Sequence, residues 1–312
     1  MKPGGPEILP LPQFSADRRE SRGGGWISPL QVSRPGFWIT SAWFYLLPLS
    51  QRPIFSEWTF WLGLFYVTFP LGLLIYGWND LADKNTDQFN PRKGTFLFGA
   101  RLSPDQLRLL PGFIAAVHAP CLALFAALAG SAMLVWYAAL LLATAIYNLP
   151  VYGFKNHPFV DLLNQAGYLL VFILGSRLNH VPELPWAAFL FGALFAMHSH
   201  LLGQIMDIAP DRLAGRRTTA ILLGPVPAKL LLALFLLVES ALVFFLFGDP
   251  LISGGCFFGA LWFLFDALAL FRGGPYPAWL MRWFLLGWNI AALGSMGWVW
   301  KNGTFLHARP WP

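Results

Sequence analysis

Three aspartates at helical spacing are the first residues in this chain whose types and positions could support chemistry. Asp80, Asp83 and Asp87 stand at positions i, i+3 and i+7, directly after Asn79. A helix through them would project all three carboxylates from one face. Like charges at this spacing repel one another by about 0.2–0.5 kcal/mol per exposed pair, so the cluster requires a compensating cation. Carboxylate and amide oxygens are hard ligands, which suit Mg²⁺ better than a soft metal.

A second acidic pair, Asp207 and Asp211, stands at i and i+4 and therefore also shares one helix face. The same stripe runs back through Gln204 and His200. Mg²⁺ usually takes one or two carboxylates and completes its shell with water and phosphate oxygens, so two facing clusters predict a magnesium–diphosphate clamp. Cations after each cluster would neutralise the remaining phosphate charge, namely Arg92, Lys93, Arg101, Arg216 and Arg217. The alternative, helix caps beside orientation-setting cations, explains one aspartate more readily than two matched clusters.

The composition places these clusters in a membrane protein. Of the 312 residues 56% are hydrophobic and 12% are charged, about half the charged fraction of a soluble domain. The formal charge of +6 does not indicate nucleic acid, because cations in membrane proteins mainly set orientation. The two cysteines lie in apolar runs and suggest neither a disulfide nor a metal site. Residues 1–35 are rich in Pro, Gly and charge and predict a disordered or interfacial cytoplasmic tail before a transmembrane domain, residues 36–312.

Hydrophobic segments predict an all-α membrane protein with about nine transmembrane helices in a bundle, seven being the alternative number. The segments are residues 36–50, 58–77, 110–128, 131–149, 162–178, 186–203, 225–248, 251–271 and 279–300. A cytoplasmic N-terminus would leave few of the 21 Lys and Arg residues outside, namely Arg52, Arg177, Lys301 and Arg309. This bias predicts a cytoplasmic N-terminus, an outer C-terminus, and both aspartate clusters in a cytoplasmic cap of two loops.

The two clusters resemble the signatures of the UbiA superfamily of intramembrane prenyltransferases. The first, N-D-x-x-D-x-x-x-D, is matched by Asn79, Asp80, Asp83 and Asp87. The second, D-x-x-x-D followed by R/K-x-x-G-x-x-T, is matched by Asp207, Asp211, Arg212, Gly215 and Thr218. The resemblance implies a nine-helix bundle around a central cavity, two Mg²⁺ ions that bind an isoprenyl diphosphate, and a prenyl tail that runs into the membrane. It also implies that Asp80, Asp83, Asp207 and Asp211 are catalytic.

Further stretches resemble the branch that contains lycopene elongases of C50 carotenoid synthesis. They are SRPGFW (33–38), NPRKG (90–94), YNLPVYGFKNHPFVD (147–161) and MHSHLLGQIMDIAPDRLAG (197–215). Many family members carry another Asp near position 204, where this chain has Gln204. The departure leaves two carboxylates in the second motif.

The resemblance implies further residues near the active site, with Lys155 and Asn79 on the diphosphate and the cavity residues Tyr147, Asp161, Asn164, His200 and Gln204. Taken alone, Tyr147 is typical of an interfacial aromatic residue, Lys155 of an orientation marker and Asp161 of a helix-dipole partner. His198 and His200 at i, i+2 point to different helix faces, which argues against a shared metal. Glu239 and Asp266 lie within spans, where a carboxylate is expensive, so both are functional candidates without a partner visible in the sequence.

The predicted reaction is Mg²⁺-dependent transfer of an isoprenyl group from an allylic prenyl diphosphate to a lipophilic acceptor, with lycopene and dimethylallyl diphosphate as the expected pair. The alternatives are an aromatic acceptor of the quinone or chlorophyll type, a UbiA-type terpene cyclase, and a non-enzymatic transporter that binds a cation. The expected location is the inner membrane of a bacterium. A benzoate-type acceptor would require a further cation for its carboxylate, and Arg177 is the one extra candidate.

Overall fold

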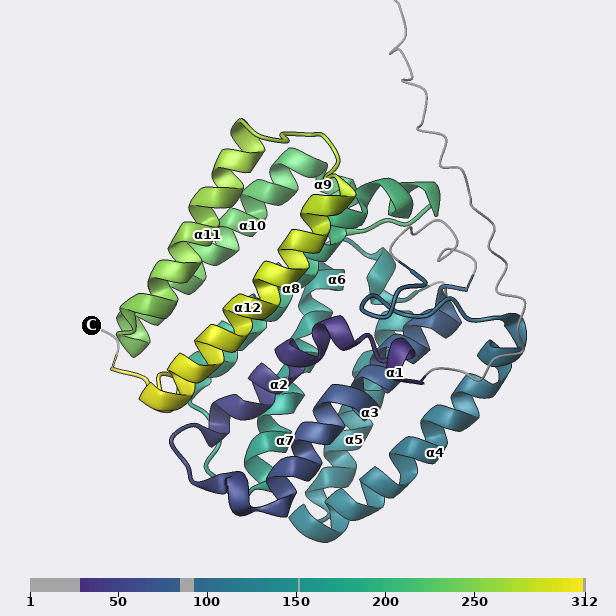
Figure 1. Ribbon diagram of the computed structural model, residues 1–312, viewed down its shortest axis with the longest axis vertical. Helices are drawn as coiled ribbons and strands as arrows, with labels where there is room; N and C mark the ends of the chain where they lie inside the picture. Colours follow the sequence, from purple (N-terminus) through teal and green to yellow (C-terminus); the bar gives the residue numbers. More distant parts are fainter. Residues whose placement is uncertain (1–28, 85–92, 151, 311–312) are drawn as a thin grey trace, which may run out of the picture.

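The computed structural model describes residues 29–84, 93–150 and 152–310. Within these ranges the chain is helical, without strands and with one isolated β-bridge between Thr95 and Gly99. The α-helices of Figure 1 are α1 (Pro29–Val32), α2 (Trp38–Leu46), α3 (Trp58–Ala82), α4 (Pro104–Ala129), α5 (Ala132–Asn148), α6 (Val160–Leu163), α7 (Leu170–Leu178), α8 (Trp186–Leu213), α9 (Thr219–Leu223), α10 (Pro225–Leu242), α11 (Pro250–Leu268) and α12 (Ala278–Asn302). Short 3₁₀ segments are η1 (Pro35–Phe37), η2 (Leu47–Leu49), η3 (Ile54–Ser56), η5 (Phe154–Asn156) and η6 (Asn164–Leu169), and a π-helical turn is η7 (Val243–Phe247).

Five of the described helices are long and apolar enough to cross a membrane: α3, α4, α8, α10 with its η7 extension, and α11. Each of the nine predicted segments falls on helical structure, so the all-α prediction is confirmed. The number nine stays a prediction. The segment 36–50 contains a helix of only nine residues, and the segment 162–178 changes from α6 through η6 to α7.

Both aspartate motifs lie at the C-terminal ends of long helices. Helix α3 continues to Ala82, and Asp83 ends it, with its backbone N–H donating to the Asn79 carbonyl at 2.8 Å. Helix α8 continues to Leu213 and therefore includes Asp207 and Asp211. The partial negative charge at a helix C-terminus disfavours carboxylates, so both positions depend on cations from other parts of the chain.

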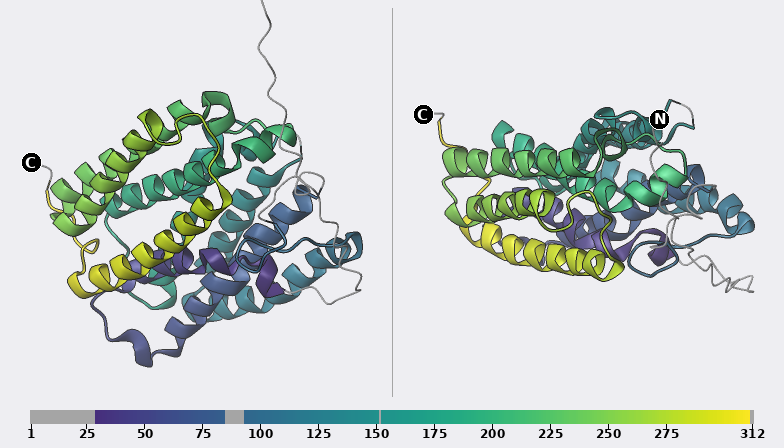
Figure 2. Two further views of the ribbon diagram at one scale, coloured as in Figure 1. Left: turned by 45° about the horizontal axis from the view of Figure 1, so that its top comes forward. Right: turned by 90° about the horizontal axis from the view of Figure 1, so that it is seen from above.

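The helices form a bundle in which α2 and α8 lie between two outer groups (Figures 1 and 2). One outer group contains α3, α4 and α5, the other contains α10 and α11, and α12 runs beside α2. Helices α10 and α11 pack closely against each other, and α10 also packs on α8. One cluster of buried hydrophobic residues centres on α2, α3 and α7, and a second joins α8, α10 and α11.

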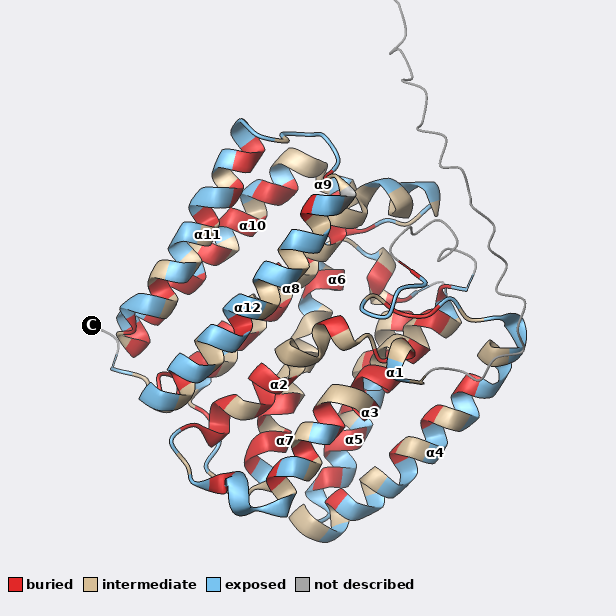
Figure 3. Cartoon of the chain, viewed as in Figure 1, coloured by how far each residue is buried: buried red, intermediate tan, exposed pale blue. Residues whose placement is uncertain are grey.

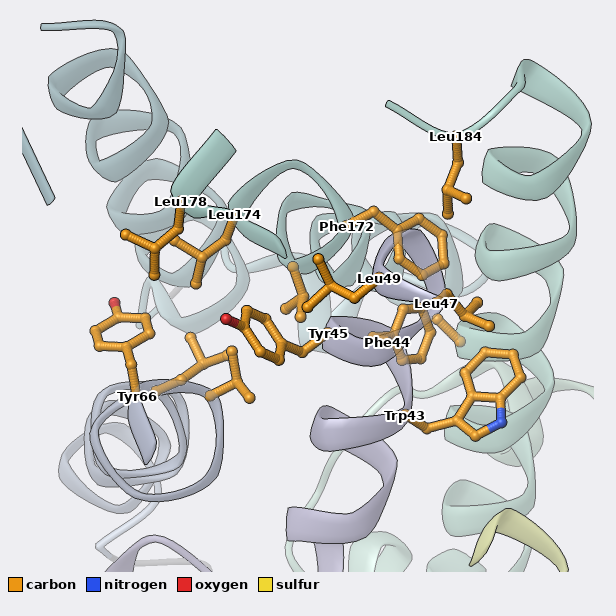
Figure 4. Close-up of a cluster of buried hydrophobic side chains, with 14 of the residues drawn as sticks. Trp43, Phe44, Tyr45, Leu47, Leu49, Tyr66, Phe172, Leu174, Leu178 and Leu184 are labelled. Carbon is orange, nitrogen blue, oxygen red and sulfur yellow. The ribbon is translucent and has the colours of Figure 1, made fainter. Parts of the chain in front are cut away.

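Helix α2 is short, but aromatic packing anchors it in the bundle. Trp43, Phe44 and Tyr45 are all buried, and Figure 4 shows them among residues of neighbouring helices. The Phe44 ring stacks on Phe172 of α7, with centroids 5.1 Å apart, and the Trp43 ring stacks on Phe195 of α8 at 5.0 Å. These contacts fix α2, and with it the segment that precedes it, against both halves of the bundle.

The outer faces of the helices carry large apolar side chains. Figure 3 shows exposed positions along α4, α11 and α12. Val135 of α5 and Phe258 of α11 are each 72% exposed, and the described surface bears many similar residues. Soluble proteins rarely expose contiguous apolar surface of this extent, whereas lipid chains solvate it without cost. The structure therefore agrees with the membrane location predicted from composition.

The carboxylates within the spans have partners that lie far away in the sequence. Glu239 of α10 contacts His198 of α8, with Oε1 and Nδ1 2.6 Å apart. The Asp266 carboxylate of α11 contacts Lys229 Nζ at 2.9 Å and accepts a hydrogen bond from the Tyr276 hydroxyl. Both pairs therefore connect helices, which gives these residues a structural role that the sequence did not reveal.

Close packing at Gly63 provides a test of this arrangement. A Cβ at Gly63 would lie 2.1 Å from the Tyr45 hydroxyl oxygen, which is held by the Phe60 carbonyl and the Asn179 amide. We expect Gly63→Ala to lower the free energy of unfolding by about 1–3 kcal/mol, the usual cost of overpacking. Thermal unfolding in detergent micelles measures the change.

Gly112→Ala is the matched control, because Gly112 also lies within a helix and a Cβ there would meet nothing within 4 Å. Its substitution should leave stability unchanged or raise it by up to about 1 kcal/mol. Equal unfolding temperatures for the two variants would contradict the packing described for α2 and α3.

Candidate active site

One arginine brings the two aspartate motifs together. The Arg216 guanidinium lies in the turn after α8, with Nη2 2.6 Å from Asp83 Oδ2 and Nε 3.5 Å from Asp211 Oδ1. The end of α3 and the end of α8 therefore meet at the same end of the bundle. The carboxylates come from residues more than a hundred positions apart, and their shared cation holds them in one site.

Asp83 is buried among several cations and an amide. Lys155 Nζ lies 2.5 Å from Oδ1, and the Asn79 amide donates to Oδ2 at 2.9 Å. Burial raises the pKa of the Asp83 carboxyl, but the charges of Arg216 and Lys155 outweigh this effect and hold the pKa below its ordinary value. Burial likewise opposes the charge of Arg216, but Asp83 and Asp211 raise its pKa. Asp83 and Arg216 are therefore both ionised throughout the neutral range.

Asp80 is buried beside a different set of cations. Its Oδ1 contacts Lys93 and lies 2.9 Å from Arg34 Nη2. Its second oxygen, Oδ2, is buried and has no hydrogen-bond partner among the residues that the structure describes. A buried carboxylate oxygen without a partner is costly in the folded protein, so this atom is suited to receive a cation or a donor from a bound group.

Arg34 is a site residue whose role no pattern in the sequence predicted. Its guanidinium contacts Asn79 Oδ1 at 3.2 Å and lies 4.5 Å from the centroid of the Tyr76 ring. Its backbone is left-handed, with φ of 52°. Arg34 belongs to the SRPGFW stretch, which carried part of the family resemblance, but no spacing rule places residue 34 beside residue 80.

A cavity of about 340 Å³ has a polar wall and an apolar wall. Its volume lies within the usual range of small-molecule sites. Its polar wall includes Arg34, Asn79, Asn148, Lys155, Asp207, Asp211 and Arg216. Its apolar wall includes Phe37, Phe44, Leu71, Ile75, Leu140, Val171, Phe195, Phe284, Leu285 and Trp288. The cavity therefore fits a molecule with an anionic end and an apolar body.

Most of the other predicted cavity residues also line this space: Tyr147, Asn164, His200 and Gln204. His198 points away to Glu239 while His200 contacts Tyr147, as their i, i+2 spacing predicted. Asp80, Asp83 and Lys93 lie buried behind the wall rather than in the lining, and Arg101 and Arg217 are exposed. Asp87 and Arg92 fall outside the described residues.

Asp161, which we predicted as a possible cavity residue, is not among the described residues that line the cavity. It is fully buried, and its carboxylate accepts hydrogen bonds from the Thr219 backbone N–H at 2.8 Å, the Thr219 hydroxyl and the Gln204 amide at 2.7 Å. The Gln204 carbonyl in turn accepts from the Ala220 N–H at 3.2 Å. Asp161 thus ties α6, α8 and α9 together, and the amide at position 204 supplies a donor that an aspartate could not.

The donor set suits a hard cation. In the described part of the chain, no three or more His, Cys, Asp and Glu residues form a group that could hold a metal by themselves. An ion here would use one or two carboxylates and take its other ligands from water and phosphate oxygens, which is the usual habit of Mg²⁺. The buried, unpartnered Asp80 oxygen and the all-oxygen acidic side chains fit that ion.

Fold and site together define an all-helical membrane protein with an acidic and cationic site above an apolar cavity. The sequence pattern described as the UbiA prenyltransferase family matches residues 37–290. The chain therefore belongs to the UbiA prenyltransferase family, and it is a prenyltransferase. This finding confirms the predicted resemblance. It also excludes the alternative that the chain is a non-enzymatic transporter.

Curated relatives carry a carotenoid-related name. The chain is 29% identical to a lycopene elongase/hydratase of Corynebacterium glutamicum over 217 residues, which cover 69% of this chain and 75% of that protein. It is 31% identical to a protein of the same name from Halobacterium salinarum over 201 residues, covering 62% and 70% of the two chains. The predicted similarity to the lycopene elongase branch is therefore confirmed.

Solved structures share the fold. A UbiA homolog from Archaeoglobus fulgidus bound to DMAPP and Mg²⁺ aligns with a TM-score of 0.66 and 20% identity, covering 88% of this chain and 99% of that chain. The apo structure of a UbiA homolog from Aeropyrum pernix aligns with a TM-score of 0.53 and 21% identity, covering 86% and 95%. At these identities the likeness establishes the fold.

The bond between Gln204 and Asp161 generates a stability prediction. We expect Gln204→Glu to lower the free energy of unfolding by about 3–5 kcal/mol, because it places a second carboxylate against a buried one and removes its donor. Asn164→Asp is the control, since Asn164 lines the same cavity half-buried and should tolerate the charge. Thermal unfolding in detergent compares them. Equal losses of stability in the two variants would show that the fold does not depend on an amide donor at position 204.

Proposed function

We propose that this prenyltransferase moves an isoprenyl group from an allylic prenyl diphosphate to a lipophilic acceptor, with dimethylallyl diphosphate as donor and lycopene as acceptor. The observation that carries the proposal is a cavity whose polar wall bears Asn79 of the first motif and Asp207 and Asp211 of the second, and whose other wall is aromatic and aliphatic. An allylic diphosphate has the same division into an anionic head and an apolar body.

The polar wall would hold the diphosphate. Mg²⁺, bound through Asp80, Asp83, Asp207 and Asp211 with Asn79 beside them, would supply positive charge against the leaving diphosphate. Two ions are proposed, one for each motif. A UbiA homolog of known structure that is bound to DMAPP and Mg²⁺ supports the pairing of an allylic diphosphate with Mg²⁺. Lys155 and Arg216 line the cavity and can reach phosphate oxygens directly.

The apolar wall would protect the cation that forms when the allylic C–O bond breaks. Tyr76 and Tyr168 line the cavity near the site, with their hydroxyls 3.3 Å apart, and Phe37 and Phe44 complete an aromatic wall. Ring faces stabilise a nearby cation, and a closed apolar wall keeps water from it. A double bond of the acceptor then attacks the cation, and the resulting acceptor cation loses a proton or takes up water.

The charges around the cavity favour a polyene over a benzoate. Among the described lining residues, the Lys and Arg side chains all contact motif carboxylates: Arg34 contacts Asp80, and Lys155 and Arg216 contact Asp83. Arg177, in the last turn of α7, pairs instead with the exposed Glu183 at 2.6 Å. A benzoate carboxylate would therefore lack a cation of its own. The relatives named lycopene elongase/hydratase give the positive support. Aromatic quinone- or chlorophyll-type acceptors and terpene cyclisation remain the alternatives.

We also propose how the chain is oriented in the membrane. Residues 36–312 would form the catalytic transmembrane domain, and residues 1–35 a cytoplasmic tail. Both motifs would then face the cytoplasm of a bacterial cell, where soluble diphosphates are made. The distribution of Lys and Arg residues along the sequence supports this orientation.

The metal-binding assignment predicts that Asp207→Asn lowers diphosphate release by about 100-fold or more, because it removes charge that acts on the transition state. Asp105→Asn should leave release unchanged, since Asp105 is exposed at the start of α4 and pairs with the exposed Arg108 at 3.5 Å. Release of diphosphate from labelled dimethylallyl diphosphate, with Mg²⁺ and after chelation, measures both variants. Retained activity in Asp207→Asn at saturating Mg²⁺ would refute the assignment.

The acceptor is tested separately. Purified protein in lipid is given labelled dimethylallyl diphosphate with lycopene and with 4-hydroxybenzoate in parallel, and products are identified by mass. We expect label in a lengthened carotenoid and none in the benzoate, because the cavity offers the benzoate carboxylate no uncommitted cation. Label only in the aromatic product would overturn the acceptor and leave the prenyltransferase assignment intact.

A further inference from the structure

A tyrosine and a histidine meet within the cavity, beside its polar wall. Tyr147 ends α5 and His200 lies on α8, and both line the cavity. The Tyr147 hydroxyl oxygen is 3.2 Å from His200 Nε2, and the two rings meet edge to face with centroids 5.9 Å apart. The geometry is that of a directed hydrogen bond between two groups that can each carry a proton.

The position of this pair along α8 is set by the helix repeat. His200 precedes Asp207 by seven residues, so it lies on the same face and about 10 Å further into the bundle. Beyond it the wall becomes apolar at Phe195 and Ala196. The pair therefore lies between the place proposed for the diphosphate and the place proposed for the hydrocarbon.

His200 is the only histidine among the described residues that line the cavity. The neighbouring hydroxyls of Ser199 and Thr144 donate to backbone carbonyls of their own helices, Phe195 and Leu140. A hydroxyl held in this way is a poor proton acceptor, whereas a neutral imidazole has a ring nitrogen whose lone pair can accept a proton.

We propose that Tyr147 and His200 form the proton relay that ends prenyl transfer. The inference rests on the proposed function and adds the step that it leaves open. When an acceptor double bond attacks the allyl cation, a carbon–carbon bond forms and a tertiary cation remains on the acceptor. A hydrogen on the adjacent carbon leaves as a proton to the Tyr147 oxygen, and its bonding electron pair becomes the new double bond.

The same movement passes the original hydroxyl proton of Tyr147 to His200 Nε2 and leaves an imidazolium. Tyrosine is thereby regenerated without ever becoming a free phenolate. The imidazolium releases its proton to water or to the departing diphosphate after turnover, so charge and protons balance. If water is present in the cavity, the relay takes the proton of the attacking water in the same way, and the product is an alcohol.

The relay acts after the allylic bond has broken, which makes it separable from ionisation. Without it, the acceptor cation persists, the new bond reverts, and the allyl cation is captured by water as a small alcohol. We therefore expect His200→Gln and Tyr147→Phe to release diphosphate at close to the normal rate. The ratio of coupled product to released diphosphate should fall by about 100-fold, the lower end of the contribution of a positioned base.

Released diphosphate and coupled product are measured in one reaction, with labelled dimethylallyl diphosphate and lycopene in lipid. Ser199→Ala serves as the control. Ser199 is adjacent to His200 and also lines the cavity, so its variant should keep the normal ratio. A normal ratio in either relay variant, or a parallel loss of release and coupling, would overturn the relay. Tyr147→Phe decides the question if His200→Gln does not fold, because it removes only a hydroxyl. Absence of release by the unsubstituted protein would instead overturn the proposed function, and the relay with it.

Discussion

The site depends on the neutralisation of buried carboxylates at two helix C-termini. Asp80 and Asp83 are almost fully buried at the end of α3, where the helix dipole opposes negative charge. Cations from other segments compensate them: Arg34 and Lys93 at Asp80, Lys155 and Arg216 at Asp83. Leaving one such charge unpaired costs several kcal/mol, so the polar segments are held in place by the charges that they neutralise.

This constraint explains the shape of the loops. Arg34 adopts a left-handed backbone, and the Gly36 N–H after it donates to the Leu97 carbonyl at 3.2 Å. The segment before α2 and the segment before α4 are thereby joined above α3. On the other side, buried Asp161 fixes the turn after α8 through Thr219 and Gln204. Each half of the polar wall has its own anchor, and Arg216 connects the halves.

Other polar side chains inside the bundle either connect helices or line the cavity. His198 with Glu239 and Lys229 with Asp266 connect helices and do not line the cavity. Tyr147 and His200 line it, although His200 is only two residues from His198. The difference follows from helix geometry, since neighbours two positions apart point about 200° apart around the axis. One face of α8 therefore serves the core and another serves the site.

Sequence alone determined the membrane class, the helical segments and the two motifs. Each follows from local information: hydrophobic runs, i, i+3 and i+4 spacing, and a specific motif pattern. Tertiary structure decided which residue meets which. Arg34 with Asp80, Arg216 with Asp83 and Glu239 with His198 all join distant segments, and no period in the sequence encodes such a pair. It also gave Asp161 its partners Thr219 and Gln204, because burial and hydrogen-bond partners depend on how helices pack rather than on the residue's own neighbours.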